Sequence, residues 1–276
     1  MTDSFELYRD LIHANHILHH HSVVDAFGHI SVRHPADSSQ FIMSANMAPA
    51  LVRTPDDLVE YRVEDAQPAH EGARRGFLER YIHSEIYKRF PDVQSVVHAH
   101  AHQVLPYAIS GVPFLPCGHM AGFLGSKVPV YDIQEYYKPQ DSHDLLVNSI
   151  QLGASLAKLF SSSEAQLRFP EHEFVLMRRH GFTTVGRNIK DAVYHAVYAI
   201  QNANILTTSL LVRAGFEQLQ ARSDASNRAE VLHDMEGLTN VQMRDCERNV
   251  RGGIARPWGL WVQEVKTLPL YTSKVE

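Results

Sequence analysis

Residues 92–102 read DVQSVVHAHAH, a run of β-branched apolar residues that ends in alternating histidines. Such a run is typical of a buried strand. Alternate residues of a strand point to the same face, so His98 and His100 should converge on one point, as a divalent metal requires. Two histidines at this spacing are a weak signal by themselves. The prediction of a metal site therefore depends on a further ligand elsewhere in the chain.

The stretch 178–186, RRHGFTTVG, offers that ligand. His180 lies at a predicted turn between two β-rich segments, and the glycine after it permits a close approach of the backbone. The alternative is a turn histidine bonded to its own backbone. Three neutral imidazoles suit Zn²⁺ and leave positions open for water or substrate. Mn²⁺ or Fe²⁺ could use the same ligands.

Residues 74–90, RRGFLERYIHSEIYKRF, have the apolar spacing of an amphipathic helix that stops at Pro91. Glu79 and His83 are four residues apart and so share one face of it. A single glutamate on such a helix is usually a solvated residue. If this face looks toward the metal, however, Glu79 becomes a candidate acid/base.

The remaining pattern alternates helices and strands, which favours an α/β sandwich. In the strand at 30–33 we expect Ile30 and Val32 to face inward and Ser31 and Arg33 outward. The other predicted helices are 5–20, 100–109, 141–160 and 189–214, and the other predicted strand segments are 41–44, 55–65, 128–131 and 174–186.

Composition excludes several classes of protein. The 276 residues are 44% hydrophobic and 21% charged, with a net charge of -5, which argues against nucleic acid or an anionic membrane as a partner. No apolar run approaches the ~18 residues of a membrane span. The N-terminus lacks the pattern of a secretory signal, and two cysteines make no disulfide framework. We expect a cytoplasmic protein acting on a small molecule.

Several motifs together resemble the class II aldolase/adducin family, over roughly residues 5–215. They are GHISVR, Glu79-Arg-Tyr-Ile-His83 with Tyr87, FPDVQSVVHAHAH and RHGFTTVG. The resemblance implies a three-layer α/β/α sandwich around a mainly antiparallel sheet. It also implies one divalent ion per subunit on His98, His100 and His180, with zinc expected first and manganese or iron as alternatives. Glu79 would be the acid/base and would touch the metal when substrate is absent.

The same resemblance implies a homotetramer with sites near the subunit interfaces. We divide the chain into a catalytic domain, residues 1–215, and a helical and aromatic tail, residues 216–276, which packs on the domain or on a neighbouring subunit.

The phosphate-binding motifs of the family's sugar-phosphate aldolases are altered here. His29 stands where asparagine is expected, the next motif reads MSANMAP, and Arg75-Gly76-Phe77-Leu78 precedes Glu79. A phosphate needs several converging donors, so sugar-phosphate aldolase activity is disfavoured. The segments DAFGHISVR, SANMAPALV, HMAGFLGSKVPVYD and AVYAIQNA are instead similar to decarboxylases of hydroxylated pyridine or benzene dicarboxylates, such as 3-hydroxy-2-methylpyridine-4,5-dicarboxylate decarboxylase.

This branch implies a metal-dependent lyase that decarboxylates a hydroxylated aromatic or pyridine carboxylate. The expected substrate contacts are His29, Arg33, Ser44 and His119. The alternative is that these residues have only structural roles, on the surface or in the core. Tyr131 is carried over as a catalytic residue because aldolases of the family place a tyrosine near this position that reaches a neighbouring subunit's site, although Tyr136 and Tyr137 compete.

Three other functions stay open. The first is a class II aldolase that cleaves a non-phosphorylated hydroxy-keto acid, and the second is a non-haem Fe(II) oxygenase acting on an aromatic acid. The third is a non-enzymatic, adducin-like binding module. The module is disfavoured because the three histidines and Glu79 are all present.

Overall fold

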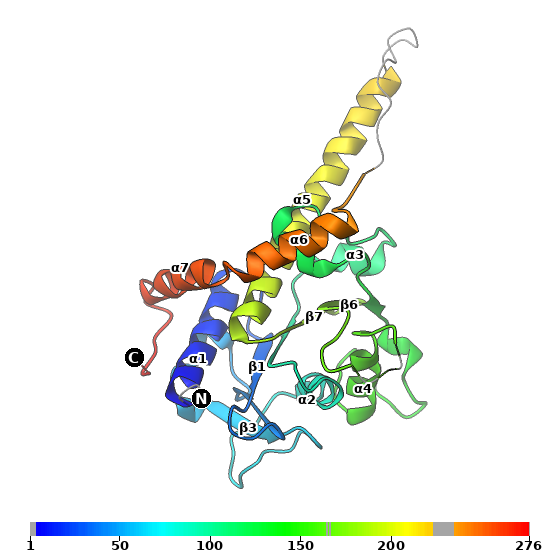
Figure 1. The fold of residues 1–276 in the computed structure, drawn as a ribbon. Coiled ribbons are helices and arrows are strands. Elements are labelled where there is room, and N and C mark those ends of the chain that lie inside the picture. The colour runs from blue at the N-terminus through cyan, green and yellow to red at the C-terminus, as the bar shows by residue number, and fades with distance from the viewer. Residues whose placement is uncertain (1–3, 164, 166, 223–234, 276) are drawn as a thin grey trace.

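The computed structural model describes residues 4–163, 165, 167–222 and 235–275. A seven-stranded sheet in the order β3-β2-β1-β4-β7-β6-β5 forms its centre, and helices cover both faces (Figure 1). Every neighbouring pair of strands is antiparallel except β5 and β6, which are parallel. The predicted α/β sandwich around a mainly antiparallel sheet is confirmed.

The strands are β1 (His29–Arg33), β2 (Gln40–Ser44), β3 (Leu58–Arg62), β4 (Ser95–Ala99), β5 (Val130–Tyr131), β6 (Phe174–Met177) and β7 (Gly181–Gly186). The α-helices are α1 (Ser4–His20), α2 (Arg80–Arg89), α3 (Leu105–Ile109), α4 (Ile150–Lys158), α5 (Ile189–Arg222), α6 (Asn240–Arg251) and α7 (Ala255–Lys266). Short 3₁₀ helices are η1 (Pro49–Leu51), η2 (Pro55–Asp57), η3 (His119–Leu124) and η4 (Ile133–Glu135).

Two apolar cores lie on opposite faces of the sheet. The larger core joins α1, the first half of α5 and α7 to residues such as Ile30, Val97 and Phe182. The second core joins α2 and α4 to alternate strand residues such as Met43, Val96 and Val185. Alternation along β4 therefore directs His98 toward the face that α2 covers, the same face as Val96.

Two details of the sequence prediction are wrong on this face. The helix predicted over 74–90 begins only at Arg80, because the residues before it form an irregular segment and a turn, with the Arg75 carbonyl accepting from Asn46 N–H at 2.8 Å. Ser31 and Arg33 do not face outward, since α2 covers that face and all five residues of β1 are buried. Successive side chains of β1 therefore point in turn toward the two apolar cores.

The C-terminal segment packs on the same chain. Trp258, Trp261 and Val265 of α7 are buried in the larger core, and Val275 packs with Ile12 and Val52. Helix α5 continues through residue 215, where the sequence analysis divides the chain, and its second half projects from the body in Figure 1.

Both cysteines, Cys117 and Cys246, are free thiols. Among the described residues, no helix combines the length and the apolar character needed to cross a membrane.

Candidate metal centre

Four side chains from three separate segments meet at the end of β4. They are Glu79, His98, His100 and His180, and one ligand atom from each lies within 4.8 Å of all the others. His98 belongs to β4, His100 follows that strand, and His180 occupies the turn between β6 and β7. Because β4 and β7 are antiparallel neighbours, the end of one strand meets the start of the other. The predicted convergence of these residues is present in the structure.

Hydrogen bonding presents His98 as a ligand. Its Nδ1 lies 3.0 Å from the Phe182 carbonyl oxygen and so carries the hydrogen, which leaves the lone pair on Nε2. Burial, only partly opposed by Glu79, lowers the pKa of His98 to about 4 and keeps the ring neutral at pH 7. The Nε2 atom is buried and has no hydrogen-bond partner among the described residues. A buried lone pair without a partner is what a metal ion would satisfy.

His100 and His180 support the same conclusion. Their Nε2 atoms lie 3.0 Å apart, and each also faces the Glu79 carboxylate. In a tetrahedral site with Zn–N bonds near 2.0–2.1 Å, neighbouring ligand nitrogens lie roughly 3.4 Å apart. The donor set, three imidazoles and one carboxylate, therefore fits a divalent transition metal, and the first three could hold it.

Glu79 faces all three rings. Its carboxylate oxygens lie 3.5 Å from His98 Nε2, 3.7 Å from His100 Nε2 and 3.6 Å from His180 Nε2. The N–H of Val147, in the loop before α4, donates to Oε1 at 3.0 Å and holds the group in place. Burial would raise the pKa of Glu79, but the electrostatic influence of the three facing imidazoles, that of His98 first, outweighs burial and holds the pKa well below its ordinary value. The group is a carboxylate at neutral pH.

The turn before β7 fits only glycine at its last position. A Cβ on Gly181 would overlap the backbone oxygen of Ala99, and the residue has φ 155°. Gly181 thus lets the turn press against the end of β4, which brings His180 to His98 and His100. This close approach is the role that the sequence analysis predicts for the glycine.

A buried hydrogen-bonded chain leads away from the cluster. His29 pairs with His98 across β1 and β4, and its Nδ1 lies 2.7 Å from His83 Nε2. His83 Nδ1 in turn lies 2.6 Å from Ser31 Oγ, which is 2.8 Å from Tyr87 OH. His29 Nε2 is buried without a described hydrogen-bond partner. The sequence analysis missed Ser31 here because it treated that face of β1 as solvent-exposed.

Other predicted contacts lie elsewhere. Arg33, at the far end of β1 from His29, donates to the carbonyl oxygens of Val93, Ser38, Tyr87 and Phe90 and thereby ties α2 to β1. Ser44 follows Ile42 by two residues, so it faces the α1 side of the sheet. The structure does not bring either side chain to the metal ligands.

Tyr131 and His119 are also apart from the cluster. The Tyr131 side chain is 1% exposed, and its hydroxyl lies 2.8 Å from Ser155 Oγ of α4. It is therefore engaged within its own subunit and does not reach outward. His119 begins η3 and is exposed to solvent.

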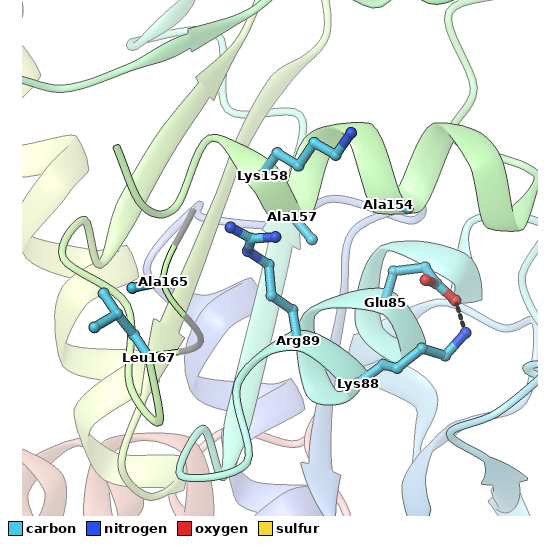
Figure 2. A pocket seen from close by; sticks show the side chains of 8 residues that line it. All are labelled: Glu85, Lys88, Arg89, Ala154, Ala157, Lys158, Ala165 and Leu167. Carbon is cyan, nitrogen blue, oxygen red and sulfur yellow. Dashed lines mark hydrogen bonds and ion pairs between the residues drawn. The ribbon is translucent and has the colours of Figure 1, made fainter. Parts of the chain in front are cut away.

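The groove drawn in Figure 2 is separate from this centre. Its volume is about 340 Å³ and it lies between the second half of α2, α4 and residues near 165. Its charged lining consists of Glu85, Lys88, Arg89 and Lys158, with an ion pair of 2.5 Å between Lys88 and Glu85. None of the four residues of the cluster lines it.

Comparison with known proteins identifies the family of the chain. The model of the Class II Aldolase and Adducin N-terminal domain matches residues 9–207. The chain belongs to the class II aldolase/adducin family. Its relatives include Decarboxylase tropJ of Talaromyces stipitatus, 44% identical over 265 residues, or 96% of each chain. The 3,4-dihydroxyphthalate decarboxylase of Arthrobacter keyseri is 26% identical over 231 residues, covering 82% of this chain and 86% of its own.

A solved class II aldolase has the same fold. The L-fuculose 1-phosphate aldolase of Glaciozyma antarctica PI12 superposes with a TM-score of 0.64 at 18% identity, covering 97% of this chain and 92% of its own. The family and the decarboxylase relatives confirm the prediction of a metal-dependent carbon–carbon lyase that acts on a small molecule. In the described part of the chain, Glu79, His98, His100 and His180 form a group that could hold a divalent ion.

Proposed function

We propose that this class II aldolase/adducin family member decarboxylates a hydroxylated aromatic or pyridine carboxylate, with His98, His100 and His180 as metal ligands and Glu79 as the acid/base. The observation that carries the proposal is the meeting of these four side chains within 4.8 Å at the end of β4. The decarboxylase relatives support the reaction, and one of them is named for a dihydroxylated phthalate.

Zinc is the ion we expect first, because neutral imidazoles with a nearby carboxylate are common zinc ligands. Mn²⁺ and Fe²⁺ accept the same donors. When bound, such an ion withdraws electron density from substrate oxygens and so stabilises the charge that builds up as CO₂ leaves. The residues around it must then supply orientation and proton transfer.

Glu79 can supply the proton transfer in both directions. As a carboxylate it takes the proton of the substrate hydroxyl, and the negative charge on that oxygen extends into the ring. The bond from the ring carbon to the carboxylate breaks, its electron pair stays on the ring carbon, and CO₂ leaves. Glu79 then returns the proton to that carbon and is a carboxylate again, while the product oxygen takes a proton from water. The Val147 N–H keeps the carboxylate in place between the two transfers.

His29 is the predicted substrate contact that lies beside the metal ligands. Its ring centroid is 5.1 Å from that of His98, and His83 fixes its orientation through the hydrogen bond to Nδ1. We propose that its free Nε2 contacts a substrate oxygen. His29 replaces the asparagine that is expected in the phosphate site of the family's sugar-phosphate aldolases, so the side-chain amide donor of that site is missing. We therefore favour a carboxylate over a phosphate as the group that the substrate presents. His119 stays a prediction.

We also propose a homotetramer located in the cytoplasm. Apolar side chains on the second half of α5 are largely exposed in the single chain, with Leu211 at 69%, Val212 at 68% and Leu219 at 66%. Such exposure on a projecting helix is typical of a surface that another subunit covers.

The two free thiols agree with a reducing compartment, which supports the proposed cytoplasmic location.

The test is metal analysis of the purified protein followed by a screen of hydroxylated aromatic and pyridine carboxylates for CO₂ release. We expect metal-dependent CO₂ release that a chelator abolishes and added Zn²⁺, Mn²⁺ or Fe²⁺ restores. His98→Ala and His180→Ala should each lose activity, while His143→Ala, an exposed histidine beside Tyr137, should keep it. Oxygen consumption would show an oxygenase instead, and aldehyde release an aldolase. Full activity in metal-free protein would overturn the proposal.

A further inference from the structure

A second group of potential metal ligands lies where α1 meets α7, and it shares no residue with the Glu79 cluster. It consists of His20, His21 and Glu264, with one ligand atom from each within 4.8 Å of the others. The two histidines are neighbours in the sequence, and the glutamate comes from α7 of the C-terminal segment. Figure 1 shows the two helices packed together on the same side of the sheet.

The two histidines stand at the C-terminal end of α1. Within a helix, neighbouring side chains diverge by about 100°. Here the helix ends at His20, and Ser22 takes a positive φ of 56°. The Ser22 N–H donates to His19 O at 3.0 Å and the Val23 N–H to Leu18 O at 2.9 Å, the pattern of a Schellman cap. The chain therefore turns sharply just after His21, and the imidazole centroids of His20 and His21 lie 5.2 Å apart.

Glu264 completes the group from the other helix. Its Oε2 lies 3.6 Å from His21 Nε2 and 3.9 Å from His20 Nε2. These separations are too long for hydrogen bonds but are close to the spacing of atoms that share one metal ion. Aromatic rings restrain the histidines, since Trp261 packs edge-on at 5.0 Å from His21 and Tyr271 at 6.0 Å from His20.

The facing atoms lack other partners. His21 Nε2 and Glu264 Oε2 are both buried from solvent, and neither has a hydrogen-bond partner in the described part of the chain. A buried polar atom left unpaired destabilises the fold, so two at one place call for a missing group.

We propose that His20 Nε2, His21 Nε2 and Glu264 Oε2 bind a second divalent cation of the zinc type, with water at the open position. Two imidazoles and a carboxylate are an established zinc donor set. Bound there, the ion links the end of α1 to α7 and so fastens the C-terminal segment to the sandwich. An ion that binds only the folded chain also stabilises it by mass action.

The test is a titration of the chelator-treated, full-length protein with Zn²⁺ by calorimetry, and with Co²⁺ by visible absorbance. Wild type should bind two ions per subunit. His98→Ala/His180→Ala should keep only the event at the second site. Glu264→Gln, which preserves the shape of the side chain, should weaken one event at least tenfold and leave the other unchanged, and His21→Ala should do the same.

His143→Ala is the matched control for removing a histidine and should keep both events. Melting temperature gives a second readout: the second equivalent of Zn²⁺ should raise it in wild type and not in Glu264→Gln. Circular dichroism reports whether each variant is folded. A single bound ion per subunit in wild type that is lost in His98→Ala/His180→Ala would overturn the proposal, as would two events of unchanged affinity in Glu264→Gln. Because the readout is metal binding, these results stand apart from whether the chain proves to be a decarboxylase.

Discussion

Glu79 precedes the first residue of α2, and its backbone angles, φ −86° and ψ 16°, belong to the sparsely populated region between helix and strand. Residues in active sites often occupy this region. The carboxylate is held by Val147 N–H on one side and faces three imidazoles on the other. It is thus positioned by groups outside its own helix, which suits a side chain that must take up and return a proton without moving far.

Glu79→Gln should keep the metal and lose turnover. The amide has the same shape and leaves the three histidines in place, but it cannot accept and return a proton. We expect kcat to fall by about 10²–10⁴-fold, the usual contribution of general acid–base catalysis, with metal content unchanged. Steady-state CO₂ release and metal analysis measure the two quantities. Glu85→Gln, a buried glutamate of α2 that pairs with Lys88, is the matched control and should keep kcat. A wild-type kcat in Glu79→Gln would remove the proton-transfer role.

At the scale of elements, the alternation of side chains along a strand predicts that His98 and His100 meet. It does not predict which elements cover each face of the sheet. His98 and His100 follow from their spacing, and Gly181 from its place after His180. Whether a face is buried by a helix cannot be read from one strand, so Ser31 was assigned to solvent. Ser44 belongs to the MSANMAP motif, which predicts a substrate contact. Because Ser44 alternates in step with Ile42, however, it lies on the α1 face of the sheet, opposite the face that carries His98. Glu79, predicted to lie within a helix, instead immediately precedes the first residue of α2.

Gly181→Ala tests how strongly the turn between β6 and β7 positions its histidine. A Cβ would overlap Ala99 O, and φ 155° is unfavourable for alanine. We expect a loss of about 2–4 kcal/mol in the free energy of unfolding, from strain and overpacking combined. Metal affinity at the Glu79 cluster should weaken too, because the turn that carries His180 must move away from β4.

Urea unfolding and zinc titration measure these two effects. Gly259→Ala is the matched control, since a Cβ at this position of α7 meets nothing within 4 Å. That change should leave metal affinity as it is and keep or slightly raise stability, as alanine favours helix. Equal stability of Gly181→Ala and wild type would show that the turn tolerates a side chain.

For the whole molecule, buried histidines other than the metal ligands link stability to pH. Burial is the main cause that lowers the pKa of His13 and of His16 to about 4 and that of His195 to about 3. His16 and His195 donate to backbone carbonyl oxygens of Val52 and Val185 as neutral rings. In the unfolded chain each histidine has its ordinary pKa near 6.5.

Chelator-treated protein should therefore lose stability in mild acid. As pH falls below about 6.5 the unfolded chain binds protons that the folded chain does not, so each of these histidines contributes a loss of roughly 1.4 kcal/mol per pH unit down to about pH 4. Above about pH 7 their contribution is complete and constant. Urea unfolding at several pH values between 5 and 8 measures the slope. His195→Gln should reduce that slope by about one histidine's share, whereas His143→Ala, on the surface, should not change it. An identical slope in His195→Gln and wild type would mean that His195 takes up its proton inside the folded protein.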